Sequence, residues 1–304
     1  MEISGSEPRS LGLLCGLFGY TRQAYYGQFR ETEKEAASAY LVLSEVSRIR
    51  KVQKRIGGRK LHHMLADFMK EHSLTIGRDA FFDLLRDHSL LVRRRRSRKP
   101  RTTYSGYWMK RHPNLAKEFI PVAANQLWVS DITYIRVGDG FGYLSLVTDA
   151  YSRKIVGYCL SRDLTARGCV EALRMALAGN PETDGLIHHS DRGLQYYSTR
   201  YVKLLNGRAV RISMSEKSDP LENAIAERVN GILKDELLEN RFESFAQAKR
   251  DVAEAVSIYN NLRPHLSIGM LTPAEAHIHE GPLRRLWKTR RWSNRPPFTL
   301  QASA

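Results

Sequence analysis

Three acidic residues, far apart in the chain, have types and settings that suit metal ions. Asp131 lies inside the apolar run WVSDITY (128–134), and Asp191 follows the apolar run LIHHS (186–190). Glu227 lies in a segment with helical spacing. Clustered carboxylates repel one another unless hard cations lie between them, and Mg²⁺ or Mn²⁺ prefers carboxylate oxygen. The three residues are therefore candidate ligands for divalent cations.

Two cations about 4 Å apart would activate an attacking oxygen and stabilise a leaving oxygen during in-line displacement at phosphorus. Catalysis would then be mainly positioning and charge neutralisation. Lys234 lies seven residues after Glu227 and Asn223 four residues before it, so all three share one helix face. We expect Lys234 and Asn223 to contact DNA beside the cations.

The surrounding segments predict the elements that would bring these residues together. Residues 126–137, 143–152 and 154–161 form three β-rich runs with short turns, which indicates an antiparallel meander. Further on, helical and strand patterns alternate, in the order helix 166–179, strand 185–190, helix 198–209, strand 210–215, a helix from Asp219-Pro220 to about Leu238, and a helix at 246–262. This order is typical of an α/β ribonuclease H-like core, a mixed five-stranded sheet with flanking helices. Its first strand is central and its fourth is a neighbour, so Asp131 and Asp191 would meet at one sheet edge, with Glu227 reaching them from a helix.

Two other carboxylates compete for the site. Asp149 also ends a β-rich run, where capping the next turn or pairing with Arg153 is favoured over metal binding. Glu222 is a rival third ligand, but it precedes Glu227 by five residues, which turns it well away on a helix. Trp128 is expected in the core, and His189 could contact the edge of the site.

Charge is distributed unevenly along the 304 residues. Residues 1–126 carry 24 Lys and Arg against 12 Asp and Glu, residues 127–281 carry 18 against 20, and residues 282–304 carry 6 against none. Basic ends attract phosphate, whereas a slightly acidic middle keeps carboxylates for cations. This pattern favours a polyanion-binding protein with a metal-dependent core.

The N-terminal part has two helix-turn-helix patterns. Residues 10–28 read as a short helix, a turn at Gly19-Tyr20 and a second helix capped by Thr21, with Arg22 in its first turn; a longer helix follows at 33–55. Residues 57–92 predict a second such unit, with Arg78 at the start of its second helix. Because the second helix of this motif enters the DNA major groove, Arg22 and Arg78 are candidate DNA contacts. Arg59, at the start of the first helix of the second unit, is a further candidate.

A basic arm follows, with seven positive charges in the nine residues 93–101. Such a run cannot pack into a core and is typical of a linker that contacts phosphates, so its first arginines are candidate DNA contacts: Arg93, Arg94, Arg95 and Arg96. Arg263, in NLRPH (261–265), is a further candidate, although a turn held by Pro264 explains its setting equally well. The expected domains are therefore 1–56, 57–92, a linker at 93–120, a catalytic core at 121–281 and a basic tail at 282–304.

Bulk properties exclude several classes of protein. The three cysteines lack a CxxC pair, which fits reduced thiols and argues against a disulfide framework or a zinc knuckle. The sequence has neither an apolar run of membrane-spanning length nor a signal-peptide pattern at its start. We expect a cytoplasmic protein with no membrane partner.

The motifs WVSDITYI, DAYSRKIVGY, HSDRGLQYYS, NAIAERVNGILKDEL and YNNLRPHLSIGMLTPAEA together resemble the DDE integrase-transposase superfamily. More narrowly, the chain resembles the transposase encoded by the second of two reading frames in bacterial insertion sequences. The resemblance implies that Asp131, Asp191 and Glu227 form a metal-binding catalytic triad. It implies that this triad holds two divalent ions, Mg²⁺ or Mn²⁺. It also implies strand cleavage and strand transfer on double-stranded DNA, a homo-oligomer on nucleoid DNA, and fusion with an upstream-frame product. The alternatives are a metal nuclease of the same fold and a non-catalytic DNA-binding regulator.

Overall fold

The protein is described from a computed structural model, which covers residues 11–93, 112–216 and 223–286. The chain divides into two compact units, Met1–Arg93 and Arg94–Ala304. Each unit is described by itself. No helix in the described ranges is long and apolar enough to cross a membrane.

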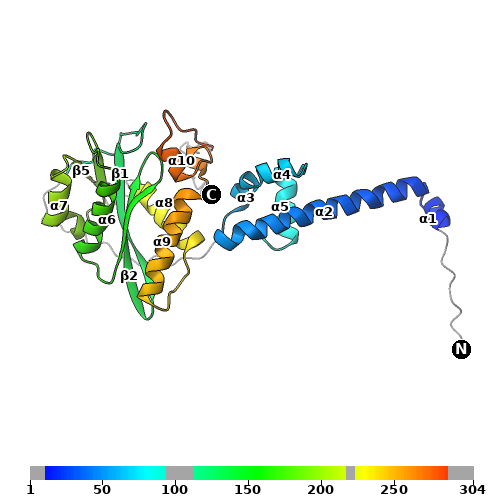
Figure 1. Cartoon of the computed structure of the whole chain (residues 1–304), viewed down its shortest axis with the longest axis horizontal. Helices are drawn as coiled ribbons and strands as arrows, with labels where there is room; N and C mark the ends of the chain where they lie inside the picture. Colours follow the sequence, from blue (N-terminus) through cyan, green and yellow to red (C-terminus); the bar gives the residue numbers. More distant parts are fainter. Residues whose placement is uncertain (1–10, 94–111, 217–222, 287–304) are drawn as a thin grey trace, which may run out of the picture. The chain divides into compact units, whose positions relative to one another are not determined.

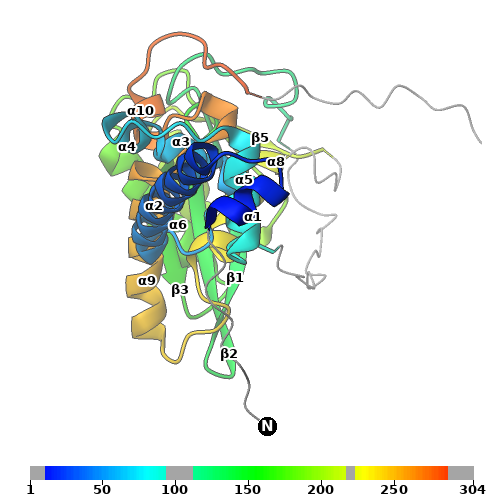
Figure 2. The ribbon, with the colours of Figure 1, turned by 90° about the vertical axis from the view of Figure 1, so that its right-hand side faces the viewer.

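The second unit contains a five-stranded sheet with the order β3-β2-β1-β4-β5 (Figure 1). The first three strands are antiparallel neighbours, whereas β4 lies parallel to β1 and β5 parallel to β4. Their bounds are β1 Leu127–Val137, β2 Gly140–Asp149, β3 Ile155–Ser161, β4 Ile187–Ser190 and β5 Arg211–Met214. The tip of the β1–β2 hairpin extends beyond the other strands of the sheet (Figure 2). This mixed sheet with a central first strand confirms the expected ribonuclease H-like α/β core.

Helices cover both faces of the sheet (Figure 1). One layer holds α6 (Ala166–Gly179), the 3-10 turn η1 (Leu194–Tyr197) and α7 (Thr199–Asn206), packed around buried residues that include Trp128, Leu173 and Tyr201. The other holds α8 (Ala224–Ile232), the π-helical turn η3 (Leu233–Leu237) and α9 (Phe245–Asn261). Two short elements follow, η4 (Leu266–Ile268) and α10 (Pro273–His277). The core sits in these two layers, and Trp128 belongs to it as expected.

Close packing of α6 on β3 depends on Gly157. A Cβ at this position would lie only 2.1 Å from the carbonyl oxygen of Ala172. Backbone cannot give way as a flexible side chain can, so only glycine lets the helix approach the edge strand this closely. The contact holds α6 against the sheet.

The first unit is helical throughout its described residues. Its elements are α1 (Leu11–Leu17), α2 (Arg22–Val52), α3 (Gly58–Met64), α4 (Ala66–Glu71) and α5 (Arg78–Asp87). Val42, Val46 and Ile49 of α2 share one hydrophobic cluster with Leu61 of α3 and Phe81 of α5. The helices on both sides of the expected boundary at 56/57 therefore fold around one core.

One expectation for this unit is wrong. The sequence correctly indicated the α1 helix, the turn at Gly19, which has a left-handed backbone, and the N-cap Thr21. The Thr21 hydroxyl oxygen accepts a hydrogen bond from the amide of Ala24. The segment expected as a second short helix and the one expected at 33–55, however, form a single helix, α2. No glycine or proline separates them, so nothing interrupts the hydrogen-bond ladder.

Candidate active site

The parallel pairing of β1 with β4 places two aspartates side by side. The last matched pair is Ser130 with Ser190; Asp131 is the next residue on β1, and Asp191 is the first residue after the end of β4. Neighbouring strands lie about 4.8 Å apart, so two acidic residues at matching positions share one small region. The sheet register thus brings together two residues that are 60 positions apart in sequence.

The α8 helix and η3 lie along β1 and fix the third acidic residue. Asn223 donates from Nδ2 to the Ser130 carbonyl at 2.9 Å, and Asn230 donates from Nδ2 to Asp131 Oδ2 at 2.7 Å. Glu227 lies four residues after Asn223 and three before Asn230, so it belongs to the same helix face. It sits in the first turn of α8 and is exposed.

The Asp131 carboxyl is electrostatically perturbed. Burial and then the charge of Asp191 raise its pKa from 3.8 to about 7, and the charge of Glu227 adds a smaller upward effect. Hydrogen bonds from the Ile132 amide and from Asn230 act in the opposite direction. A carboxyl that is costly to ionise beside two other acids gains stability from a cation.

Asp191 is held by a local turn. Its Oδ1 accepts the amide of Gly193 at 3.0 Å, which lowers its pKa, while burial has the larger effect and raises it. A Cβ at Gly193 would lie 3.0 Å from that same oxygen, which is tighter than an ordinary contact. The side chain of Arg192 donates to the Ser215 carbonyl at 2.7 Å. The glycine two positions after the aspartate therefore serves to orient its carboxylate.

In chemical type these side chains suit a hard divalent cation, because their donors are carboxylate oxygens. Within the described ranges, no group of three or more acidic, histidine or cysteine side chains is arranged to hold a metal ion. Of the two neighbouring charges that raise the pKa of Asp131, that of Glu227 has the smaller effect. The two aspartates, each of which accepts a hydrogen bond from a neighbouring group, and the exposed Glu227 are thus the carboxylates available to a cation.

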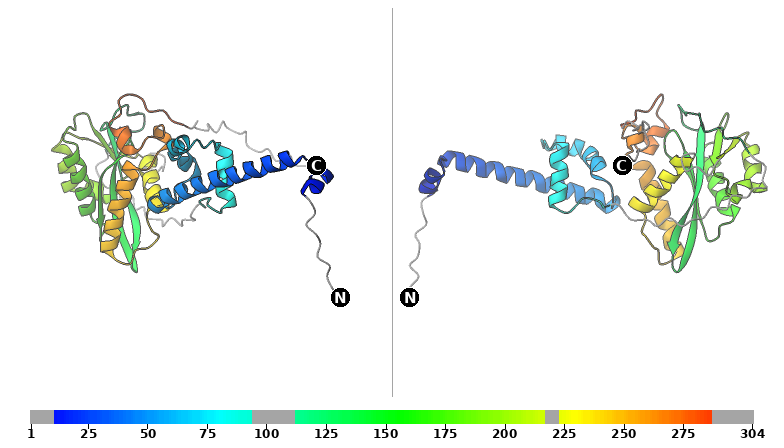
Figure 3. Two further views of the ribbon diagram at one scale, coloured as in Figure 1. Left: turned by 45° about the vertical axis from the view of Figure 1, so that its right-hand side comes forward. Right: turned by 180° about the vertical axis from the view of Figure 1, so that it is seen from behind.

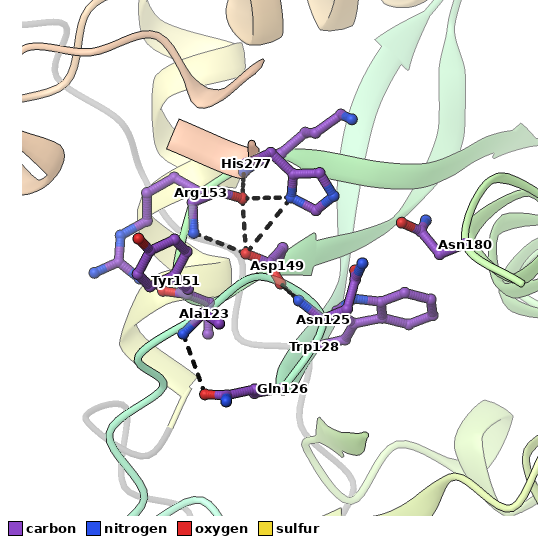
Figure 4. Close-up of polar contacts among 12 residues, drawn as sticks. Ala123, Asn125, Gln126, Trp128, Asp149, Tyr151, Arg153, Asn180 and His277 are labelled. Carbon is purple, nitrogen blue, oxygen red and sulfur yellow. Dashed lines mark hydrogen bonds and ion pairs between the residues drawn. The ribbon is translucent and has the colours of Figure 1, made fainter. Parts of the chain in front are cut away.

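Asp149 has a structural role (Figure 4). It is completely buried, its Oδ1 accepts both the amide and the hydroxyl of Ser152 at 2.7 Å, and its Oδ2 accepts the amide of Asn125 at 2.8 Å. His277 Nδ1 lies 3.9 Å from Oδ1. The turn-capping role expected for Asp149 is confirmed, whereas the Arg153 side chain donates to the Ala150 carbonyl.

Two residues expected to touch DNA are buried instead. Asn223 is 8% exposed and its amide holds β1. Arg263 is 1% exposed and forms a two-pronged ion pair with Glu236 at 2.7 and 2.9 Å, while also bonding His265. In this structure both side chains hold the fold together instead of facing solvent.

Lys234 is partly buried, and its Nζ lies 3.3 Å from the Thr133 hydroxyl on β1. Burial lowers its pKa, and the charges of Asp235 and Asp131 oppose this. Lys234 thus lies in η3, directly after α8, with its side chain against β1 close to Asp131. His189, expected at the site edge, is fully buried and bonds Ser213.

The remaining expected DNA contacts that the structure describes are exposed residues of the first unit. They are Arg22, Arg59, Arg78 and Arg93. Arg78 pairs with Asp79 at 2.8 Å, and Arg22 packs over Gly12, where a Cβ would lie only 2.4 Å from its guanidinium. Arg94, Arg95, Arg96 and the rival ligand Glu222 lie outside the described residues.

Sequence reasoning missed Asn230. It lies on the helix face already marked by Asn223, Glu227 and Lys234, three residues after the glutamate. That spacing could have identified it. Nothing in its residue type showed that its amide would bond Asp131.

Comparison with known proteins places this chain in a family. Two descriptions of an integrase core domain match the chain, at residues 121–220 and 208–273. An insertion element IS600 31 kDa protein of Shigella sonnei is 35% identical over 86% of this chain and 96% of its own length. The chain belongs to the insertion-sequence transposases of the integrase superfamily. The transposase for insertion sequence element IS629, also of Shigella sonnei, is 32% identical to this chain. The match covers 60% of this chain and 61% of the IS629 transposase.

Solved structures resemble this transposase in fold. The catalytic core domain of HTLV-2 integrase, solved in complex with magnesium, is 17% identical, covering 52% of this chain and 99% of its own, with a TM-score of 0.41. A chain of the simian T-cell lymphotropic virus intasome, solved in complex with the PP2A regulatory subunit B56 gamma, is also 17% identical; the match covers 80% of each chain, with a TM-score of 0.46.

Proposed function

We propose that this transposase cleaves DNA strands at the ends of an insertion sequence and joins them to target DNA, using Asp131, Asp191 and Glu227 with divalent cations. The observation that carries the proposal is the matched position of Asp131 and Asp191 on neighbouring strands beside the helix face of Glu227. Its substrate is double-stranded DNA, both at the ends of the element and at the target. The protein would bind this DNA in the bacterial cytoplasm, at the nucleoid.

Asp131 and Asp191 would hold the cations, Mg²⁺ or Mn²⁺ and two in number, and Glu227 would complete the set by rotating its exposed side chain toward the aspartates. When bound, the cations activate the attacking oxygen and neutralise charge on the leaving oxygen. Asn230 fixes the orientation of the Asp131 carboxylate through its 2.7 Å hydrogen bond. The Gly193 amide does the same for Asp191.

Lys234 would place its ammonium beside a DNA phosphate next to the acidic residues. Its partial burial keeps it close to β1, since Nζ contacts Thr133. Exposed Arg59, Arg78 and Arg93 of the first unit would contribute phosphate contacts, and so would Arg94, Arg95 and Arg96 of the basic run that follows. A homo-oligomer on DNA and an upstream-frame fusion partner complete the proposed assembly.

A metal nuclease of the same fold would cut DNA without joining it. The distinguishing experiment incubates the protein with Mg²⁺, a radiolabelled element-end duplex and a supercoiled target plasmid. Labelled plasmid is the result we expect. Shortened oligonucleotide without labelled plasmid would show a nuclease instead.

A further inference from the structure

The first half of α2, together with α1, exposes an unusual amount of apolar surface. The α2 helix has 31 residues, about 46 Å, and its buried residues Val42, Val46 and Ile49 all lie in its second half. The first half extends away from α3, α4 and α5 (Figure 3). The large apolar side chains at least 36% exposed on this arm, residues 11–41, are Leu13, Leu14, Leu17, Phe18, Tyr20, Tyr25, Tyr26, Phe29, Tyr40 and Leu41.

Such an arm is unfavourable in water on its own. Most helical stability in proteins comes from packing an apolar face. Contiguous exposed apolar patches of this kind mark interaction sites. A partner is therefore needed to cover the arm.

The charges of the arm argue against DNA as that partner. Residues 11–41 carry Arg22, Arg30 and Lys34 against Glu31, Glu33 and Glu35, so their net charge is zero. Residues 42–60, in contrast, carry seven Lys and Arg against one Glu. Because DNA binding is dominated by neutralisation of phosphates, the basic second half suits DNA, and the neutral apolar arm suits protein.

The spacing of residues on the arm fits another helix. Tyr25, Phe29, Thr32, Ala36 and Ala39 recur at alternating steps of four and three, which is the spacing of a coiled-coil seam. Two large residues occupy the first part of this seam, and three small residues occupy the rest. A partner helix must supply small residues opposite the large ones.

A second copy in antiparallel orientation meets this requirement. With the two-fold axis between Arg30 and Glu31, Tyr25 lies opposite Ala36 of the other copy, and Phe29 opposite Thr32. In this alignment the segment with Arg22 and Arg30 of one copy lies against the segment of the other copy that carries three glutamates, Glu31, Glu33 and Glu35. A parallel pair would instead place aromatic against aromatic and like charges together.

We propose that the arm is a dimerisation surface, on which α2 of one copy packs antiparallel against α2 of a second copy without DNA. The α1 helix folds back on the start of α2 through Gly12 and Arg22 and adds its exposed leucines to the same arm. This surface is independent of the proposed catalytic residues.

Light scattering after size exclusion, on the full chain without DNA, measures the mass directly. We expect a dimer for the unchanged protein at concentrations on the order of 10 µM. Phe29→Lys places a charge in the seam and should weaken the dimer at least about tenfold. Ala37→Lys is the matched control, since Ala37 is exposed on the same helix but lies outside the seam, and it should keep the dimer.

A monomeric mass for the unchanged protein, or equal masses for all three proteins, would overturn the proposal. So would loss of the dimer in both variants. If Phe29→Lys leaves the mass unchanged but abolishes binding to DNA, the arm is a DNA-binding element instead.

Cysteine cross-linking tests the orientation. A Phe29→Cys chain and a Thr32→Cys chain carrying different tags are mixed and oxidised, with the unchanged protein as the control for its own three cysteines. Antiparallel pairing predicts cross-links mainly between the two different chains. Cross-links only within each variant would indicate parallel pairing and contradict the proposal.

Discussion

Asp131 and Asp191 each follow directly after the paired residues Ser130 and Ser190, Asp131 on β1 and Asp191 just beyond the end of the parallel strand β4. Their shared position raises the pKa of Asp131, to which burial contributes most. Folding thus gathers negative charge where a compact protein would otherwise avoid it. Ionising Asp131 costs stability, and the Asn230 amide and the Gly193 amide hold the two carboxylates in position.

Replacing Asp131 by asparagine should stabilise the metal-free protein at alkaline pH. The folded pKa is about 7 against an ordinary 3.8, so ionising Asp131 costs stability progressively as pH rises between these values, and fully above 7. Asp131→Asn should raise the free energy of unfolding at pH 8 by on the order of 2 kcal/mol, and have little effect at pH 4. Urea unfolding in the presence of a chelator measures this.

The control for that experiment is Asp139→Asn, which changes an aspartate whose side chain is fully exposed. It should alter stability little at either pH. Equal stability of Asp131→Asn and the unchanged protein at pH 8 would mean that Asp131 ionises without cost.

Divalent cations should stabilise the folded protein. A ligand that binds the folded state alone raises the free energy of unfolding, by about 2.7 kcal/mol at a hundred times its dissociation constant. We expect Mg²⁺ or Mn²⁺ to raise the melting temperature of the unchanged protein, and to have a much smaller effect on Asp131→Asn or Asp191→Asn. The idea fails if all three proteins show the same shift.

Asn230 should act as a positioning residue. Removing its hydrogen bond in Asn230→Ala frees the Asp131 carboxylate to rotate and takes away an influence that lowers its pKa. We expect the rate of strand joining to fall about 10- to 100-fold, and the pH at which activity is half-maximal to move upward. Asn261→Ala, on the exposed end of α9, is the control. A lower rate with an unmoved pH profile would argue that Asn230 has no effect on Asp131.

Arg263 should matter for stability and not for DNA contact. Removing one partner of its buried pair with Glu236 leaves an unpaired charge, which typically costs about 3–5 kcal/mol. Arg263→Ala should therefore strongly lower the urea midpoint. Arg241→Ala breaks an exposed pair with Asp139 and should cost about 0–1 kcal/mol. Similar small losses for both variants would contradict the buried-pair interpretation.

Much of the core could be predicted from sequence because local patterns carry it. The helix expected at 166–179 is found with the same bounds, since its apolar spacing, the Thr165 cap and a flanking asparagine all agree. The placement of Asp131 and Asp191 followed from strand order, which the sequence of elements determines.

What sequence did not show was the burial of polar side chains. Arg263 and Asn223 carry groups that usually face water, and only tertiary contacts with Glu236 and Ser130 decide otherwise. The continuous α2 helix was also missed, because a weak local break was assumed near residue 30 where no breaker exists. The burial of Arg263 and Asn223 thus depends on packing between distant segments, whereas the continuity of α2 is a local property.

The most direct test of the central claim is a strand-transfer assay that compares the unchanged protein with Asp191→Asn on element-end DNA in Mg²⁺. We predict joined product for the unchanged protein and none for the variant, while both bind the DNA with equal affinity. Joined product at the same rate from both proteins would contradict the account.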